Sequence, residues 1–176
     1  MSAQGVGVKS SAVAVRYAEQ GDLPILTEIY NHYVLHTAAT FDITPFDVAS
    51  RQAWFAHYSR TGPHRLLVAT HDGEVVGYAS SSRFRPKPAY DTSIEVTVYL
   101  NPRSTGGGIG SALYERLFAE LRDEPLHRAY AVIALPNPAS VALHRRFGFV
   151  ETGMMSEVGR KYDQWWDVLM MQRSLP

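Results

Sequence analysis

The stretch LNPRSTGGGIGSALY, residues 100–114, decides the fold because it joins an apolar run to an amphipathic pattern through four glycines within five positions. Glycine adopts backbone angles closed to other residues, so successive amide N–H groups can turn toward one point. A helix that begins near Ser111 adds the positive end of its dipole there. The stretch therefore predicts a site for phosphate or another anion between a strand and a helix.

The composition favours one globular domain that acts on small molecules. The chain has 176 residues, of which 45% are hydrophobic and 11% aromatic, enough for one sizeable core. Seventeen basic and seventeen acidic side chains give no net charge, so neither nucleic acid nor an anionic membrane is expected as a partner. The chain has no cysteine, which excludes a disulfide and a cysteine nucleophile and suits the cytoplasm.

The expected organisation is a flexible lead at residues 1–10 followed by a single domain at residues 11–176. The first residues lack the apolar core of a signal peptide, and no apolar run is long enough to span a bilayer. His32 and His36 have the spacing of two metal ligands on a helix, but no third ligand accompanies them. We therefore expect no metal.

Apolar periodicity predicts an α/β fold. Apolar runs predict strands at residues 13–18, 66–70, 75–80, 94–100, 129–135, 149–157 and 165–171, and helices are expected to begin at Asp22, after Pro45, at Ser111 and at Asn137. Asp72-Gly73 predicts a hairpin between the second and third strands. We expect a mixed central sheet of about seven strands, antiparallel at first and with a parallel crossover after the glycine loop, flanked by about four helices.

The glycine loop departs from the two commonest nucleotide-binding motifs. A dinucleotide fold places Gly-X-Gly-X-X-Gly after its first strand, whereas this loop follows the fourth predicted strand and has Ser111 in place of the third glycine. A Walker loop needs Gly-Lys-Ser or Gly-Lys-Thr, which the loop lacks. Another kind of phosphate-bearing ligand is expected.

The loop resembles the acetyl-CoA motif of the GCN5-related N-acetyltransferases, in which Gln or Arg, two residues, Gly, one residue and Gly or Ala lead into a helix. Two registers are open. One begins at Arg103 and matches the motif's letters, whereas the other aligns Thr105, Gly108 and Gly110 and gives the family's usual distance to the helix leucine. We prefer the second, in which Thr replaces Gln or Arg and the backbone cradle is kept.

A second motif strengthens this resemblance. NPASVALHRRFGF, residues 137–149, is similar to the family's later signature of Asn, a short helix, an aromatic residue and Gly-Phe. The resemblance implies that Asn137 holds the pantetheine or pyrophosphate arm of acetyl-CoA, with helix capping as the alternative. It places His144 near the cofactor sulfur, where it could return a proton to the leaving thiolate, unless it is a surface histidine without a role. The implied cosubstrate-binding residues are Val96, Thr97, Val98, Arg103, Thr105, Gly106, Gly107, Gly108, Ile109, Gly110, Ser111 and Asn137.

Within this superfamily the chain resembles most closely the phosphinothricin and methionine sulfoximine acetyltransferase branch. The stretches that carry the resemblance are IYNHYVLHTAATF at 29–41, AYDTSIEVTVY at 89–99, the glycine loop and GRKYDQWWDVLMMQ at 159–172. The branch implies acetylation of the amine of a small amino acid analogue, such as phosphinothricin, methionine sulfoximine or methionine sulfone. It also implies a homodimer, and we expect Trp165 and Trp166 to pack in the core or across a dimer contact.

Glu95 is the predicted catalytic base. Alkyl ammonium groups titrate near ~10, so an amine acceptor needs a group that removes its proton. Strand alternation places Glu95 with Thr97 and Tyr99 on the face opposite the apolar residues, beside the glycine loop. A backbone N–H of this strand would then meet the oxyanion, and transfer would be direct. The alternative is a carboxylate paired with a nearby Arg or Lys.

Cations are also expected around the acceptor. Arg83, Arg85 and Lys87 precede the Glu95 strand and suit the carboxylate and the phosphinate or sulfone oxygens of an amino acid analogue. A solvated loop is the alternative. The resemblance adds three further residues to this substrate pocket, namely Phe41, Tyr90 and Lys161.

Two other functions stay open. The same fold could acetylate another amine, such as a polyamine, an aminoglycoside or a protein N-terminus, because fold similarity does not define a substrate. The chain could also be a catalytically silent acetyl-CoA-binding domain, although a carboxylate at Glu95 argues against this.

Overall fold

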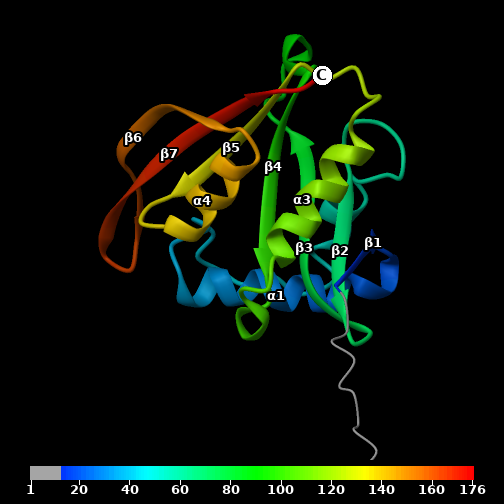
Figure 1. Cartoon of the computed structure of the whole chain (residues 1–176). Helices are drawn as coiled ribbons and strands as arrows, with labels where there is room; N and C mark the ends of the chain where they lie inside the picture. Colours follow the sequence, from blue (N-terminus) through cyan, green and yellow to red (C-terminus); the bar gives the residue numbers. More distant parts are fainter. Residues whose placement is uncertain (1–12) are drawn as a thin grey trace, which may run out of the picture.

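The computed structural model describes residues 13–176, so the lead predicted at residues 1–10 lies outside the described residues. Seven strands form one mixed sheet, as predicted, and their order in the sheet is β1-β2-β3-β4-β5-β7-β6 (Figure 1). The strands are β1 (Ala14–Tyr17), β2 (Leu66–His71), β3 (Glu74–Arg83), β4 (Ser93–Leu100), β5 (Arg128–Ala134), β6 (Val150–Lys161) and β7 (Gln164–Ser174).

Four α-helices accompany the sheet within residues 13–176. They are α1 (Leu23–His36), α2 (Gln52–Phe55), α3 (Ile109–Glu120) and α4 (Pro138–Arg146), with short 3-10 turns at Gln20–Asp22, Pro88–Tyr90 and Pro102–Ser104. The helix expected directly after Pro45 is only the single turn α2. The side chain of Asn31 explains this, because its amide bonds both the N–H and the C=O of Phe46, at 2.9 and 2.7 Å, and keeps that backbone from helical pairing.

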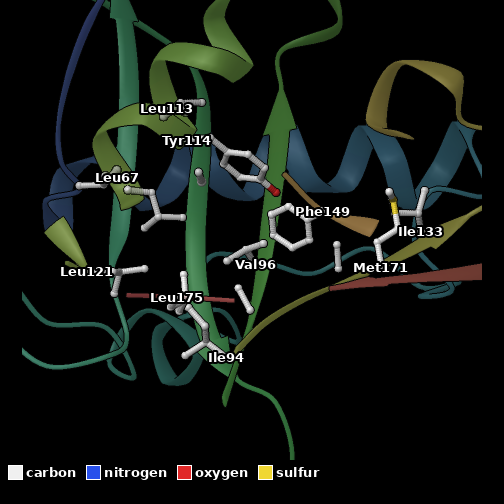
Figure 2. Packing of buried hydrophobic residues seen from close by; sticks show 14 of the residues in the cluster. Leu67, Ile94, Val96, Leu113, Tyr114, Leu121, Ile133, Phe149, Met171 and Leu175 are labelled. Atoms are coloured by element: carbon white, nitrogen blue, oxygen red, sulfur yellow. The ribbon is translucent and has the colours of Figure 1, made fainter. Parts of the chain in front are cut away.

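The helices cover the two faces of the sheet because strand residues alternate between them. Leu113, Leu117 and Leu121 of the α3 side pack with the strand residues Ile94 and Val96 in the larger core (Figure 2). On the opposite face, α1 and the α2 region pack on a second cluster that includes Leu66, Val68 and Tyr78. Figure 1 shows α3 on one side of the sheet and α1 crossing the other.

The hairpin turn between β2 and β3 was predicted from the sequence, and the turn between β6 and β7 was not. Asp72 and Gly73 have φ of 52° and 85° between β2 and β3, which confirms the predicted hairpin. β6 and β7 are longer than predicted because Tyr162 and Asp163, with φ of 54° and 56°, make the tight turn without a glycine to announce it. Trp165 of β7 is 60% exposed, so of its two predicted positions the core is wrong, and a dimer contact stays a prediction.

The feature that positions the site is the separation of the two parallel strands. β4 and β5 pair only where Ser93–Glu95 face Arg128–Tyr130, and the remaining halves diverge (Figure 1). Glu95 is the last β4 residue that is paired to β5. Backbone and side chains of both strands beyond this point are therefore free to line a cavity.

Candidate functional site

Two cavities adjoin where β4 and β5 separate. The strand cavity, about 260 Å³, lies between the diverging strands, the glycine loop and α4. The aromatic cavity, about 530 Å³, lies on the α1 face of the sheet, among α1, α2 and β3. Their walls have five residues in common, namely Ala39, Thr97, Tyr99, Val132 and Ala134. Molecules in the two cavities would therefore meet beside β4.

The glycine loop forms one end of the strand cavity. Gly106, Gly107 and Gly108 have φ of 93°, 60° and 77°, the left-handed region that favours glycine. Gly108 is the N-cap of α3, so the first amides of that helix open onto the loop. A Cβ on Gly110 would lie 3.1 Å from the Leu143 side chain, so a small residue here lets α3 and α4 approach. The loop has the geometry of an anion-binding site at a helix N-terminus.

The predicted cosubstrate-binding residues divide into two groups. Seven lie in the wall of the strand cavity, namely Val96, Thr97, Val98, Thr105, Gly106, Gly110 and Asn137. Five do not line it, namely Arg103, Gly107, Gly108, Ile109 and Ser111, and of these Ile109 is buried in the core. The sequence interpretation did not include residues 131–134 of β5, which form the wall opposite β4. The predicted parallel crossover could have indicated them, because ligands bind at the carboxyl ends of parallel strands.

Asn137 combines the two readings that the sequence left open. Its Oδ1 accepts a hydrogen bond of 3.1 Å from the N–H of Ser140 and caps α4. The residue also lines the strand cavity, and its Nδ2 group makes no hydrogen bond within residues 13–176. Capping therefore leaves an amide donor available to a molecule in the cavity.

His144 is buried, with 3% of its surface exposed, so the reading as a surface histidine is wrong. Nδ1 lies 2.8 Å from the Ser140 carbonyl oxygen, which can only accept, so Nδ1 carries the proton. Nε2, 2.9 Å from the Tyr114 hydroxyl, then accepts. Burial lowers the pKa of His144, partly opposed by the bond to Ser140. The imidazole in the strand-cavity wall is therefore neutral and has no proton to give at Nε2.

Glu95 lies in the aromatic cavity with Thr97 and Tyr99, on the face that strand alternation predicts. It forms no ion pair or side-chain hydrogen bond within residues 13–176, so the reading as a paired carboxylate is not supported. Burial raises the pKa of Glu95. A half-buried carboxylate of raised pKa, open to a cavity, has the properties of a general base.

The aromatic cavity contains a cation that the sequence interpretation missed. Arg51 is 6% exposed, and its Cζ lies 3.7 Å from the centre of the Trp54 ring and 4.6 Å from that of Tyr30. Its Nε and Nη2 are buried without a hydrogen-bond partner, a situation that costs about 1–3 kcal/mol for an ordinary buried donor. The sequence around Arg51 does not reveal its burial, because the Tyr30 ring that covers it comes from α1.

The basic residues that were predicted to bind the acceptor lie outside both cavities. Arg83 pairs with Asp91 at 2.8 Å, and Arg85 lies 5.1 Å from the ring of Phe84. These arginines, Lys87 and Tyr90 are exposed, and none of them lines either cavity. The structure thus matches the alternative of a solvated connection, since the prolines carry this segment along the surface. Their contact with an acceptor stays a prediction without a cavity to support it.

Phe41 and Lys161 have different positions. Phe41 lines the aromatic cavity and packs on Gly159, where an added Cβ would lie 2.1 Å from the ring. Lys161 is buried behind this segment, and its Nζ donates to the carbonyl oxygen of Thr40 at 2.8 Å. Burial lowers the pKa of Lys161. Lys161 is absent from the cavity wall, so it supports the loop that carries Phe41 rather than facing the acceptor.

The arrangement defines a class of protein. An anion cradle at a helix N-terminus opens into a cavity between parted parallel strands, and the wall of an adjoining cavity holds a carboxylate of raised pKa. Such a site suits transfer of a group from a phosphate-bearing donor to a second, small molecule.

Comparison with known proteins agrees with this class. Residues 26–149 match the acetyltransferase (GNAT) family, and the chain belongs to it. A "Phosphinothricin N-acetyltransferase" of Streptomyces coelicolor is 51% identical over 168 residues, 94% of this chain and 98% of that protein.

An "L-methionine sulfoximine/L-methionine sulfone acetyltransferase" of Pseudomonas paraeruginosa is 39% identical over 164 residues, 93% of this chain and 95% of that protein. A solved phosphinothricin acetyltransferase from Sinorhizobium meliloti, in complex with acetyl-CoA, has a TM-score of 0.88 and 36% identity. This likeness covers 93% of the chain and 88% of that structure. The expected family and its fold are therefore confirmed.

Proposed function

We propose that the chain transfers the acetyl group of acetyl-CoA to the amine of a small amino acid analogue of the phosphinothricin, methionine sulfoximine or methionine sulfone type. The observation that carries this proposal is the position of Glu95, unpaired and half-buried in the wall of the aromatic cavity, two residues along β4 from Thr97, which lines both cavities. The names and substrates of the relatives, together with the acetyl-CoA in the solved structure, support it.

The strand cavity is the proposed site of acetyl-CoA. The left-handed glycines and the first amides of α3 would bind the pyrophosphate, and the free Nδ2 of Asn137 would bind the pantetheine arm. Acetyl-CoA supplies an acetyl thioester. Thr97, which lines both cavities, would lie beside the reacting carbonyl, and an N–H of β4 would stabilise its developing negative charge.

The aromatic cavity is the proposed site of the acceptor amine. Glu95 would remove the proton of the bound ammonium, and the free amine would attack directly, since no cysteine is present to carry an acyl group. His144 would have a minor part in returning a proton to the sulfur. It lines the strand cavity but must first gain a proton at Nε2, which its burial disfavours.

The assembly and location of the chain belong to the same proposal. The β6–β7 ribbon exposes a set of large apolar side chains, which favours a homodimer: Val150, Met154, Val158 and Trp165. No helix within residues 13–176 is long and apolar enough to cross a membrane. We propose a cytoplasmic enzyme, in keeping with a chain without cysteine.

Release of free CoA with separate acceptors tests the proposed function. We expect turnover with phosphinothricin, methionine sulfoximine and methionine sulfone, and none with spermidine or an aminoglycoside. Turnover only with the polyamine or the aminoglycoside would keep an acetyltransferase but contradict its substrate. Binding of acetyl-CoA without turnover of any acceptor, including a peptide N-terminus, would favour the silent binding domain.

A further inference from the structure

The aromatic cavity holds a buried cation without an anion. Arg51 forms no ion pair or side-chain hydrogen bond within residues 13–176, and two of its three guanidinium nitrogens, Nε and Nη2, are buried. Arg65 is a useful comparison because it is equally buried, at 5% exposed, on the same sheet's other side. Its Nη2 lies 2.5 Å from Glu124 and its Nη1 bonds the Tyr17 hydroxyl, so only Nε is without a partner. A buried cation normally has a polar partner, as Arg65 has in Glu124 and Lys161 has in the Thr40 carbonyl, and Arg51 differs from both.

Aromatic rings satisfy only part of what Arg51 needs. Trp54 and Tyr30 lie over its guanidinium at 3.7 and 4.6 Å, and Phe46 at 5.6 Å. Rings stabilise the charge across the faces of the guanidinium. Its N–H donors lie in the plane and form a fork that matches a carboxylate. The donors, not the charge alone, therefore need a partner.

We infer that Arg51 binds the α-carboxylate of the acceptor amino acid. The inference rests on the proposed function, because it requires an acceptor in the aromatic cavity. Arg51 and Glu95 line the same cavity, and in the inferred binding mode the zwitterion has its carboxylate against the first and its ammonium against the second. Asp42 is also in this wall, but its carboxylate accepts a hydrogen bond of 2.5 Å from Tyr30 and forms no ion pair with Arg51 within the described residues.

The arrangement would select α-amino acids over other amines. A polyamine or an aminoglycoside has no carboxylate to offer a buried arginine, and its ammonium groups would be repelled by the like charge in a desolvated site. The sulfone, sulfoximine and phosphinate acceptors differ at their far ends but have an α-carboxylate in common. A single arginine can therefore serve all of them.

A pair of matched acceptors tests Arg51. Methionine sulfone and 3-(methylsulfonyl)propylamine differ only in the carboxylate. Wild-type enzyme should prefer methionine sulfone, and R51Q should raise its KM by about 30-fold or more, since breaking a buried charge pair has effects of that size. The kcat/KM of R51Q for the amine should stay within about threefold of wild type. The control R60Q removes an exposed charge that pairs only with Glu19, and neither value should change.

The outcomes separate this inference from the proposed function. Turnover of methionine sulfone by wild type with an unchanged KM in R51Q would overturn the role of Arg51 alone, as would an equal loss for both acceptors. Absence of wild-type turnover with any amino acid would overturn the proposed function and the inference with it. If R51Q does not fold, as judged by its melting temperature, R51K carries the test. It keeps the charge but loses the fork, and should raise KM for methionine sulfone by about tenfold.

Discussion

The two cavities differ in what their walls are made of. The strand cavity has glycines and the backbone of the parted strands in its wall, with Gly106, Gly110 and Ala131 among its lining residues, beside larger uncharged side chains such as Tyr33 and Leu143. The aromatic cavity is built from large side chains, including Tyr30, Trp54 and Tyr78, which come from α1, α2 and β3. Only the aromatic cavity contains the charged residues Arg51 and Glu95.

This difference matches the two molecules that the proposed reaction joins. A pyrophosphate can be bound by backbone amides, which any sequence supplies once the chain turns correctly. An acceptor is distinguished by its side chain and charges, which only side chains can recognise. Side-chain substitutions should therefore change turnover and acceptor choice, while backbone substitutions should change acetyl-CoA binding.

The largest expected effect is at Glu95. We expect E95Q to lower kcat by about 10² to 10⁴-fold, the usual contribution of a general base, with little change in KM for acetyl-CoA. Steady-state kinetics with methionine sulfone measure both values. A kcat within a few-fold of wild type would remove Glu95 from the mechanism.

The pH profile gives an independent measure of the same group. A base acts only when deprotonated, and burial raises the pKa of Glu95, so kcat should rise with pH through a value above that of a free glutamate. Below this pKa the carboxyl is protonated and inactive. The rise should be absent from the residual activity of E95Q, and a rise that persists would assign it to another group.

The next largest effect is expected in the glycine loop at the end of the strand cavity, where Gly108 itself does not line the cavity. Gly108 has φ of 77° at the N-cap of α3, and alanine there is strained by about 1–2 kcal/mol. We expect G108A to raise KM for acetyl-CoA by about tenfold and to leave KM for methionine sulfone unchanged.

Gly62 offers a matched control for this substitution. Its φ is 80°, and it lies outside both cavities. G62A should lose similar stability in a thermal melt while both KM values remain those of wild type. A rise in KM for acetyl-CoA in both variants would mean that general destabilisation, not the cradle, is responsible.

The sequence predicted the strand cavity better than the aromatic cavity, and the reason is the same difference in construction. The glycine loop at the end of the strand cavity depends on local spacing, which turn chemistry reveals, and in the aromatic cavity the strand position of Glu95 follows from periodicity in the same way. Arg51 is informative only because of its burial without an anion, a property that appears after α1 and α2 have packed.

Lys161 is a residue for which the sequence predicted a binding role that the fold does not support. Its sequence motif suggests a binding residue, but in the fold its Nζ donates to the backbone of Thr40, far away along the chain. Contacts of this kind depend on how β6 and β7 meet the loop after α1, and no local signal records them.

The smallest effect is expected at His144, the one histidine in the strand-cavity wall. If that cavity acts through its backbone, then H144Q should lower kcat by less than about tenfold, because the neutral imidazole has no proton at Nε2 and thiolate leaves readily. Y114F removes the hydroxyl that Nε2 accepts from and serves as the matched control, since it keeps the imidazole but frees Nε2. A loss of 100-fold in H144Q, with Y114F near wild type, would instead give His144 a central role as proton donor and place a decisive side chain in the cavity that otherwise depends on backbone.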